Sequence, residues 1–232
     1  TTLNSIAWEA FATGSPLVVK AVRGVRRRRT LKADRAEIVG ALLSAARGQD
    51  GVKALRDVAL ILTLSDTGLR RAECASLRVR DLDLPNRAAW VQGKGQQGER
   101  VAADLSADAV AALRAYLDAR GSLDADAPAF ASADPFGKGT GALTPDGIRC
   151  VLVSLSRRAG LPSAVKPHDL RRLGARTLAL SGASAESIRE WGRWSDLRMP
   201  SLYIGQADEL ARGAVERLAE LRRADPDGPA VR

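Results

Sequence analysis

Apolar residues recur at helical spacing through most of this sequence from residue 34 onward. Glycines such as Gly48, Gly68 and Gly121 close several of these segments, and Asp34 and Thr144 are suited to N-cap two of them. The pattern predicts helices over residues 34–48, 51–67, 70–79, 106–120, 144–160 and 206–224, one through the run HDLRR that ends before Gly182, and one that opens at Ser184. In the apolar segment 51–67 we expect burial of Val58, Ala59, Leu60, Ile61, Leu62 and Leu64.

β-forming residues surround one short hairpin. Trp90 and Val91 lie on one side of the glycine-rich run GKGQQGE, and Val101 lies on the other. Residues 122–143 are rich in Gly, Asp, Ala and Pro, which indicates a long surface loop. The fold class expected from these patterns is mainly α with a small antiparallel β hairpin.

A glycine-serine-proline break at residues 14–16 and a basic run set the N-terminal segment apart. We expect residues 1–33 to form a segment of their own and residues 34–232 to form the main domain. Taken alone, the basic run indicates a solvated linker face. In front of a DNA-binding domain it would instead lie along phosphates and add affinity without sequence information. The run consists of Arg26, Arg27, Arg28 and Arg29.

The charge balance points to a polyanionic partner. The 232 residues include 36 Lys and Arg against 27 Asp and Glu, a net charge of +9, and an apolar fraction of 45% that is ordinary for a globular protein. Nucleic acid is the expected partner, and an acidic membrane surface is the weaker alternative. Because no signal peptide and no long uncharged apolar run are present, we expect a soluble, cytoplasmic protein.

The supply of metal-ligating side chains is small. Cys74 and Cys150 form no metal spacing and no disulfide framework, and His168 is the only histidine. A His/Cys metal site is therefore excluded, whereas counting does not decide on an all-carboxylate Mg²⁺ site. We expect Cys74 to pack in the core.

The chemistry is concentrated in residues 166–203. Within HDLRR, His168 and Arg171 are three apart, so on a helix both project from one face and can converge on one small anion. Arginine offers a planar fork of donors for phosphate oxygens, and histidine can exchange a proton near neutral pH. Together they form a plausible phosphate clamp.

Four motifs in a fixed order resemble the tyrosine recombinases, or phage-type integrases. HDLRR is followed by GRWSDLRMPSLY, in which Trp194 stands nine residues before Tyr203, as in the Cre-like form of the family. Upstream, DTGLRRAECASLRVRDLDL resembles the first arginine box, and WVQGKGQQGERV resembles the hairpin that carries a lysine. Together they extend from about residue 56 to the C-terminus.

The resemblance implies the catalytic-domain fold of that family and a role for each motif residue. Tyr203 would be the nucleophile, His168 would bind the phosphate and assist as a base, and Trp194 would donate an N–H or pack near Tyr203. Lys94 would protonate the leaving 5′ oxygen, although the loop looks one residue longer than in the family. The implied catalytic set is Arg70, Lys94, His168, Arg171, Trp194 and Tyr203.

Two arginines compete for the first arginine position. The resemblance selects Arg70, with Glu73 three residues away to hold its guanidinium, and leaves Arg71 as a surface or DNA-backbone contact. Tyr116 is the rival nucleophile. We discount it because its helical neighbours are aliphatic and no Arg–His pair lies near it in the sequence.

The implied activity is site-specific recombination through a 3′-phosphotyrosyl intermediate, without metal, ATP or other cofactor. The implied partner is double-stranded DNA, bound by a homotetramer in a synapse, with a monomer possible in solution and no membrane partner. Residues 1–33 would be the remnant of a core-binding domain plus linker. The protein would be bacterial or phage-encoded and nucleoid-associated, and its helix 206–224 would dock in cis or in trans.

Two other functions are compatible with some of these features. A type IB topoisomerase shares the tyrosine and arginine chemistry, but that pattern generally has lysine where His168 stands. A non-catalytic basic DNA-binding module would explain the charge and the helices, but it would leave the convergence of Arg70, Lys94, His168, Arg171 and Tyr203 as a coincidence.

Overall fold

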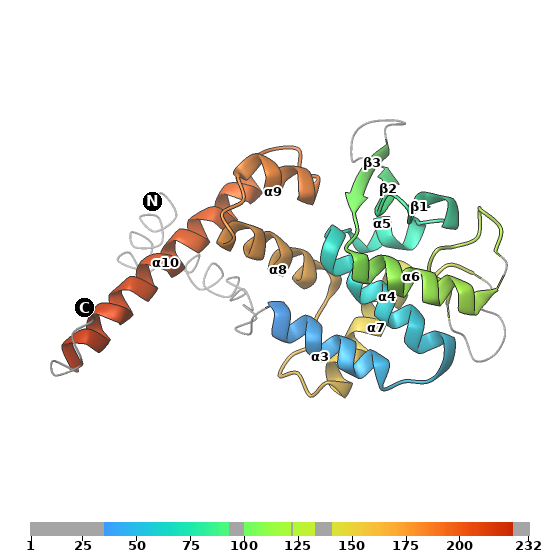
Figure 1. Cartoon of the computed structure of the whole chain (residues 1–232), viewed down its shortest axis with the longest axis horizontal. Coiled ribbons are helices and arrows are strands. Elements are labelled where there is room, and N and C mark those ends of the chain that lie inside the picture. Colours follow the sequence, from blue (N-terminus) through green and yellow to red (C-terminus); the bar gives the residue numbers. More distant parts are fainter. Residues whose placement is uncertain (1–34, 93–99, 122, 133–140, 225–232) are drawn as a thin grey trace, which may run out of the picture. The chain divides into compact units, whose positions relative to one another are not determined.

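The computed structural model describes residues 35–92, 100–121, 123–132 and 141–224 (Figure 1). The chain divides into Thr1–Lys32 and Ala33–Arg232, and all described residues belong to the second unit. The N-terminal segment of residues 1–33, with its linker arginines 26–29, lies outside the described residues, and so does Lys94.

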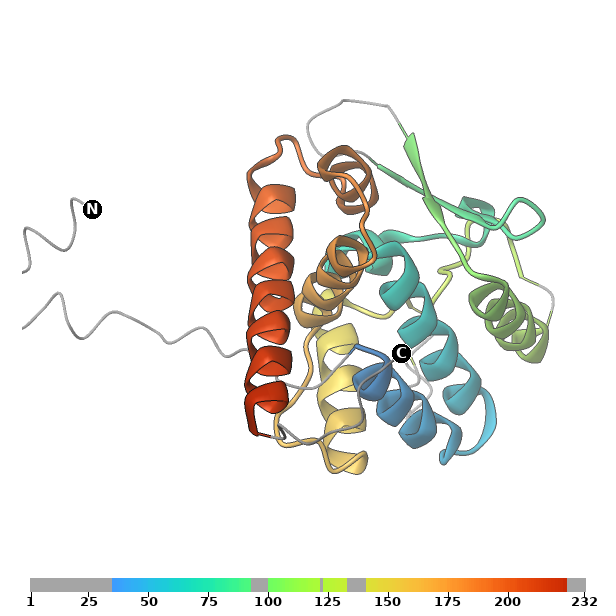
Figure 2. The ribbon, with the colours of Figure 1, turned by 60° about the vertical axis from the view of Figure 1, so that its left-hand side comes forward.

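The described unit is mainly helical, as the sequence pattern predicts. Helix α4 lies at its centre and contacts α3, α6 and α8, and Figure 2 shows these helices around it. The helices are α3 (Arg35–Arg47), α4 (Gly51–Thr67), α5 (Arg71–Ser76), α6 (Ala107–Arg120), α7 (Pro145–Arg158), α8 (Pro167–Leu180), α9 (Ala185–Gly192) and α10 (Arg198–Ala224), with the 3₁₀ turn η1 (Val79–Asp81) after α5.

A three-stranded antiparallel sheet covers one side of this helical unit. Its order is β1 (Leu82–Asp83), β2 (Ala88–Gln92) and β3 (Arg100–Asp104), with Val91 paired to Val101. The strands β2 and β3 are the predicted hairpin. The sequence missed β1, because a two-residue strand is too short to show a periodicity and forms only by pairing with Ala88 and Ala89.

Local end signals set the starts of α7 and α9 as predicted. The Thr144 hydroxyl accepts a hydrogen bond from the N–H of Gly147 at 3.0 Å, and the Ser184 hydroxyl accepts one from Ser187 at 3.1 Å. At the end of α4, Gly68 adopts a left-handed conformation with φ 56° and donates its N–H to Leu64. This turn sets the direction in which the chain leaves α4.

Helix α4 contributes many buried apolar residues to the core, and it also contains a buried charged pair that the sequence did not reveal. Ala59, Leu60, Ile61 and Leu64 are buried as predicted, whereas Val58 and Leu62 are half-buried. Arg56 is 4% exposed and Asp57 is fully buried; the guanidinium donates to the carboxylate from Nε at 2.9 Å and Nη2 at 2.7 Å. A third donor, Nη1, reaches the carbonyl of Ala131 at 3.1 Å and so ties the 123–132 segment to α4.

The last helix begins earlier than predicted. The expected helix 206–224 is correct at its C-terminal end, but α10 starts at Arg198 and therefore includes Tyr203. Pro200 masked this start in the sequence. It is tolerated because the first N–H groups of a helix have no intrahelical partner. The first turns of α10 pack on α8 and α9, and its later turns extend beyond them (Figure 1).

No described helix combines the length and the apolar character needed to cross a membrane.

Candidate active site

The segment between α4 and α5 places Arg70, the first of the predicted site residues. After Gly68, Arg70 takes an extended conformation as the N-cap of α5, so the predicted helix 70–79 is shortened to α5. The guanidinium of Arg70 donates from Nη1 to Oε1 of Glu73 at 2.5 Å, and its backbone N–H donates to Oε2 at 2.8 Å. Glu73 therefore orients Arg70, as expected from their spacing.

The carboxylate of Glu73 is held in its charged form. Partial burial alone would raise the pKa of Glu73, but hydrogen bonds from the backbone and side chain of Arg70 and the charges of Arg193 and Arg70 outweigh it. The net result is a pKa below the ordinary value of 4.5. The contact with Arg70 is thus an ion pair at neutral pH.

Arg171 is buried where three segments meet. It projects from α8, is 3% exposed, and donates from Nη1 to the carbonyl of Gly68 at 2.5 Å and from Nη2 to the carbonyl of Gly192. Burial lowers its pKa to about 10, and the charges of Arg70 and Arg193 add to the shift. Arg171 stays protonated at neutral pH and links two loops that are far apart in sequence.

The two predicted arginines and the histidine share one pocket. A cavity of about 300 Å³ opens between the start of α5, α7 and the start of α8. Its lining is strongly basic, since all of its residues except Leu69, Pro167 and His168 are arginine or lysine. The lining residues are Leu69, Arg70, Arg71, Arg149, Lys166, Pro167, His168 and Arg171.

His168 lies at the start of α8 and is exposed on this pocket. Partial desolvation lowers its pKa below 6.5, and the positive charges of Arg172, Arg171 and Arg70 act in the same direction against that of Asp169. The imidazole is therefore neutral at pH 7 and can accept a proton.

Trp194 connects Arg171 to Tyr203. The guanidinium carbon of Arg171 lies 4.4 Å from the centre of the Trp194 ring, and the rings of Trp194 and Tyr203 lie 6.0 Å apart at 40°. Tyr203 is 3% exposed and packs with Ala175 and Ile188. Trp194 and Tyr203 thus lie beside the pocket, behind Arg171, and do not line it.

The rival tyrosine belongs to the core in another region of the unit. Tyr116 is 1% exposed and its hydroxyl accepts a hydrogen bond from the N–H of Ala131 at 3.1 Å. Its ring stacks on Phe130 with centroids 6.2 Å apart, and it lines no basic pocket among the described residues. Cys74 is buried as well, and burial raises the pKa of its thiol.

Arg71 lies at the rim of the pocket, on the surface. Its Nη1 donates to Asp146 at 2.8 Å, and both side chains are exposed.

Sequence reasoning missed three other residues around the site. Arg149 and Lys166 gave no signal because isolated basic residues are common, and Arg193 gave none because its contacts are with residues far away in the sequence. Among the described residues no three metal-ligating side chains cluster.

Residues 34–209 match the model of the phage integrase family. A tyrosine recombinase of Synechococcus elongatus is 29% identical over 182 residues, which are 77% of this chain and 56% of that protein. The tyrosine recombinase XerC of Oceanobacillus iheyensis is 35% identical over 160 residues, which are 68% of this chain and 52% of that protein. This chain spans about half the length of the curated relatives it matches.

Solved structures show the same fold. The XerA recombinase is similar with a TM-score of 0.66 at 22% identity, over 83% of this chain and 65% of that chain. The Tn1549 transposon integrase in complex with circular intermediate DNA is similar with a TM-score of 0.63 at 18% identity, over 83% of this chain and 68% of that chain. The fold class predicted from the sequence is confirmed.

Proposed function

Because this chain belongs to the phage integrase family, we propose that it is a site-specific DNA recombinase that cuts and rejoins DNA strands through a 3′-phosphotyrosyl intermediate on Tyr203. The observation that carries the proposal is the basic pocket shared by Arg70, His168 and Arg171, with Tyr203 packed beside it behind Trp194. These residues come from three separate segments of the chain.

The two arginines bind the scissile phosphate. A guanidinium has five N–H donors, and Arg171 uses two of its nitrogens on the carbonyls of Gly68 and Gly192. Arg70 keeps a third of its side chain exposed, 33%, while Glu73 fixes its rotamer. The remaining donors stabilise the charge that builds on the non-bridging oxygens during cleavage.

Tyr203 attacks phosphorus, and the 5′ oxygen leaves. The O–P bond to Tyr203 forms as the bond to the 5′ oxygen breaks, so the phosphodiester energy is kept for rejoining. His168, neutral at pH 7, takes the phenolic proton, and Arg171 beside Trp194 favours the negative charge on the oxygen. Lys94, which lies outside the described residues between β2 and β3, protonates the leaving 5′ oxygen.

Attack requires a movement of the first turns of α10. Tyr203 is 3% exposed and lies behind Trp194, whereas the phosphate binds in the pocket in front of Arg171. Five residues, Arg193 to Leu197, join α9 to α10, and the exposed residues 195–197 among them can carry this shift. DNA binding or assembly would trigger this movement, because a DNA phosphate would supply the negative charge that the basic pocket attracts.

The partner is double-stranded DNA, and the assembly is a homotetramer in the synapse, with a monomer in solution. The XerH site-specific recombinase bound to its palindromic difH substrate has the same fold, with a TM-score of 0.63 at 20% identity. Residues 34–232 act as the catalytic domain, and Arg26, Arg27, Arg28 and Arg29 lie along DNA phosphates.

Covalent capture tests the proposal. The protein is mixed with nicked suicide duplexes that contain candidate sites, the mixture is denatured, and the adduct is located by peptide mass. We expect an adduct on Tyr203 that Tyr203→Phe abolishes and Tyr116→Phe does not. An adduct on Tyr116, or DNA binding with no adduct on any candidate site, would refute the mechanism.

A further inference from the structure

Arg193 stands in an unusual backbone conformation inside the site. It follows α9 as its C-cap with φ 48° and ψ 49°, in the left-handed region. A side chain with a Cβ adopts this region rarely, and such conformations persist where the surroundings hold them. The side chain of Arg193 is 7% exposed, so the surroundings that hold it are protein atoms.

The guanidinium of Arg193 closes the end of α4. Nη1 and Nη2 each donate to the carbonyl of Thr67 at 3.1 Å, and Nη1 also donates to the carbonyl of Trp191 at 3.0 Å. Thr67 is the last residue of α4, where carbonyls lack intrahelical partners and a positive charge is favourable. Arg193 therefore links the end of α9, which precedes Trp194, to the end of α4, which precedes Arg70.

The same guanidinium reaches the carboxylate that orients Arg70. Nη2 of Arg193 lies 3.4 Å from Oε2 of Glu73, while Oε1 accepts from Arg70. In addition, Nη2 of Arg70 donates to the backbone carbonyl of Arg193 at 3.4 Å. Among the described residues, the Arg70 guanidinium donates to two acceptors, and Arg193 is linked to both: its side chain contacts Glu73, and its backbone carbonyl is the second acceptor.

We propose that Arg193 is a positioning residue for DNA cleavage, which holds Glu73 and the α9–α10 junction so that Arg70 presents its free donors to the scissile phosphate. This inference rests on the proposed function of Tyr203 and adds a residue to it. Arg193 does not line the phosphate pocket, and its side chain is 7% exposed, so its role in this proposal is exerted through Arg70. Its charge also favours the ionised carboxylate of Glu73.

The positive φ of Arg193 makes glycine a suitable substitution for testing its side chain. Arg193→Gly removes the guanidinium and at the same time relieves the left-handed strain, because glycine adopts positive φ readily. The readouts are the DNA dissociation constant, measured in a Tyr203→Phe background, and the single-turnover rate of adduct formation at saturating protein. We expect an unchanged dissociation constant and a cleavage rate roughly 100-fold lower, the size of effect that a misplacement of about 1 Å produces.

Two further variants separate positioning from simple structural support. Arg193→Lys keeps the charge near Glu73 but lacks the fork that spans Thr67 and Glu73, so its cleavage rate should fall between wild type and Arg193→Gly. In a double-mutant cycle, Arg193→Gly should slow cleavage less in a Glu73→Gln protein than in wild type, because both act through Arg70. Additive losses would overturn the proposal.

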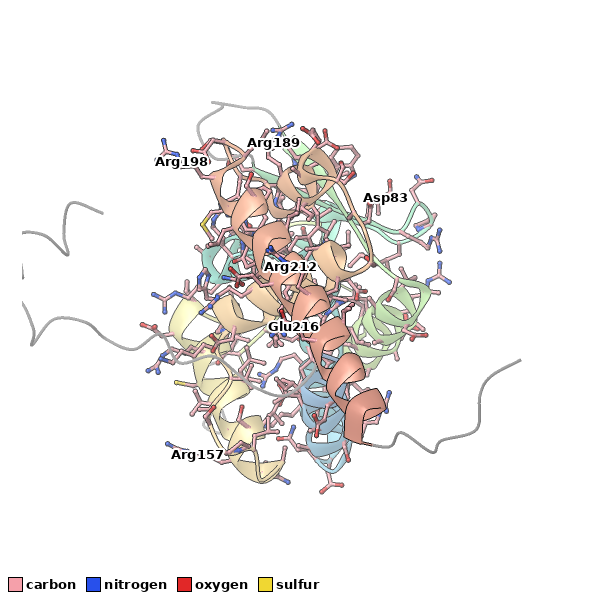
Figure 3. All side chains as sticks on the ribbon, turned by 90° about the vertical axis from the view of Figure 1, so that its left-hand side faces the viewer. Asp83, Arg157, Arg189, Arg198, Arg212 and Glu216 are labelled. Atoms are coloured by element: carbon pink, nitrogen blue, oxygen red, sulfur yellow. The ribbon has the colours of Figure 1, made fainter. Side chains whose placement is uncertain are left out.

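The matched control is Arg189→Ala. Arg189 lies on the same helix α9, is labelled in Figure 3, and has a side chain that is 37% exposed and 3.6 Å from Glu190. We expect wild-type cleavage from this control. A folded Arg193→Gly protein that cleaves at the wild-type rate, or one whose DNA binding and cleavage fall in proportion, would refute the positioning role. A wild-type protein that forms no adduct would refute the proposed function instead.

Discussion

The guanidinium carbon of Arg171 lies over the ring of Trp194, 4.4 Å from its centre, and Tyr203 packs on the same tryptophan with ring centroids 6.0 Å apart. Arg171 and Tyr203 thus pack against the same indole. A cation over a tryptophan face is attracted by the ring, more strongly when desolvated. Trp194 therefore has a packing role in this state that does not depend on its N–H group.

Trp194→Ala should destabilise the protein by about 3 kcal/mol, because it removes a large ring from between two buried side chains. The free energy of unfolding in urea measures this. Trp90→Ala serves as the control, since Trp90 is 38% exposed on β2 and its loss should change stability by about 0.5 kcal/mol or less. Equal losses for the two variants would contradict the packing role.

Trp191 should make Gly174 intolerant of even a methyl group. A Cβ at Gly174 would lie 2.5 Å from Cη2 of Trp191, whose indole N–H donates to the carbonyl of Asp66 at 2.6 Å. Gly174→Ala should therefore lower the free energy of unfolding by about 2 kcal/mol, an overpacking effect. Calorimetry or urea unfolding measures it.

The control for this prediction is Gly40→Ala on α3, where a Cβ meets nothing within 4 Å. It should stabilise the helix by roughly 0.5–1 kcal/mol, because alanine loses less backbone freedom than glycine. Adding Trp191→Phe to Gly174→Ala should recover some of the loss. If the smaller ring restores nothing, the contact is not the cause.

Cleavage should keep its rate down to a pH below 6.5 and then decline. Burial and the neighbouring arginines lower the pKa of His168, so the neutral base persists below the ordinary histidine value and is lost only when the pH falls through the lowered pKa. The single-turnover rate as a function of pH tests this. His168→Asn should slow cleavage and remove this limb. A limb centred above pH 6.5 would contradict the proposed base.

Arg149 should contribute one phosphate contact. It lines the pocket, and its side chain forms no hydrogen bond or ion pair with the other described residues. Arg149→Ala should weaken DNA binding and reduce the slope of log K against log salt by about 1. Fluorescence anisotropy across a salt series measures both quantities.

Arg157→Ala is the matched control on the same helix. Arg157 lies eight residues further along α7, about 12 Å along the axis at 1.5 Å per residue, and Figure 3 shows it at the far end of that helix. Its salt slope should equal that of wild type. Identical slopes for all three proteins would exclude Arg149 from the interface.

Features that depend on a few adjacent residues could be predicted from the sequence. Thr144 and Ser184 begin their helices through hydrogen bonds to N–H groups three residues away. His168 and Arg171 share a face of α8 because of their spacing alone, and Glu73 finds Arg70 for the same reason. In each case one turn of helix sets the geometry, so the pattern suffices.

Features that depend on contacts between distant segments were decided only by the tertiary structure. The bond from Arg171 to Gly68 joins residues 103 apart, and neither residue type reveals the other. The burial of Tyr203 behind Trp194 follows from α10 starting at Arg198 and packing on α8 and α9. Arg193 likewise gains its partners, Thr67 and Glu73, only because packing brings the ends of α4 and α9 together. Periodicity and caps determine the elements, whereas side-chain volume and long-range hydrogen bonds determine which elements meet.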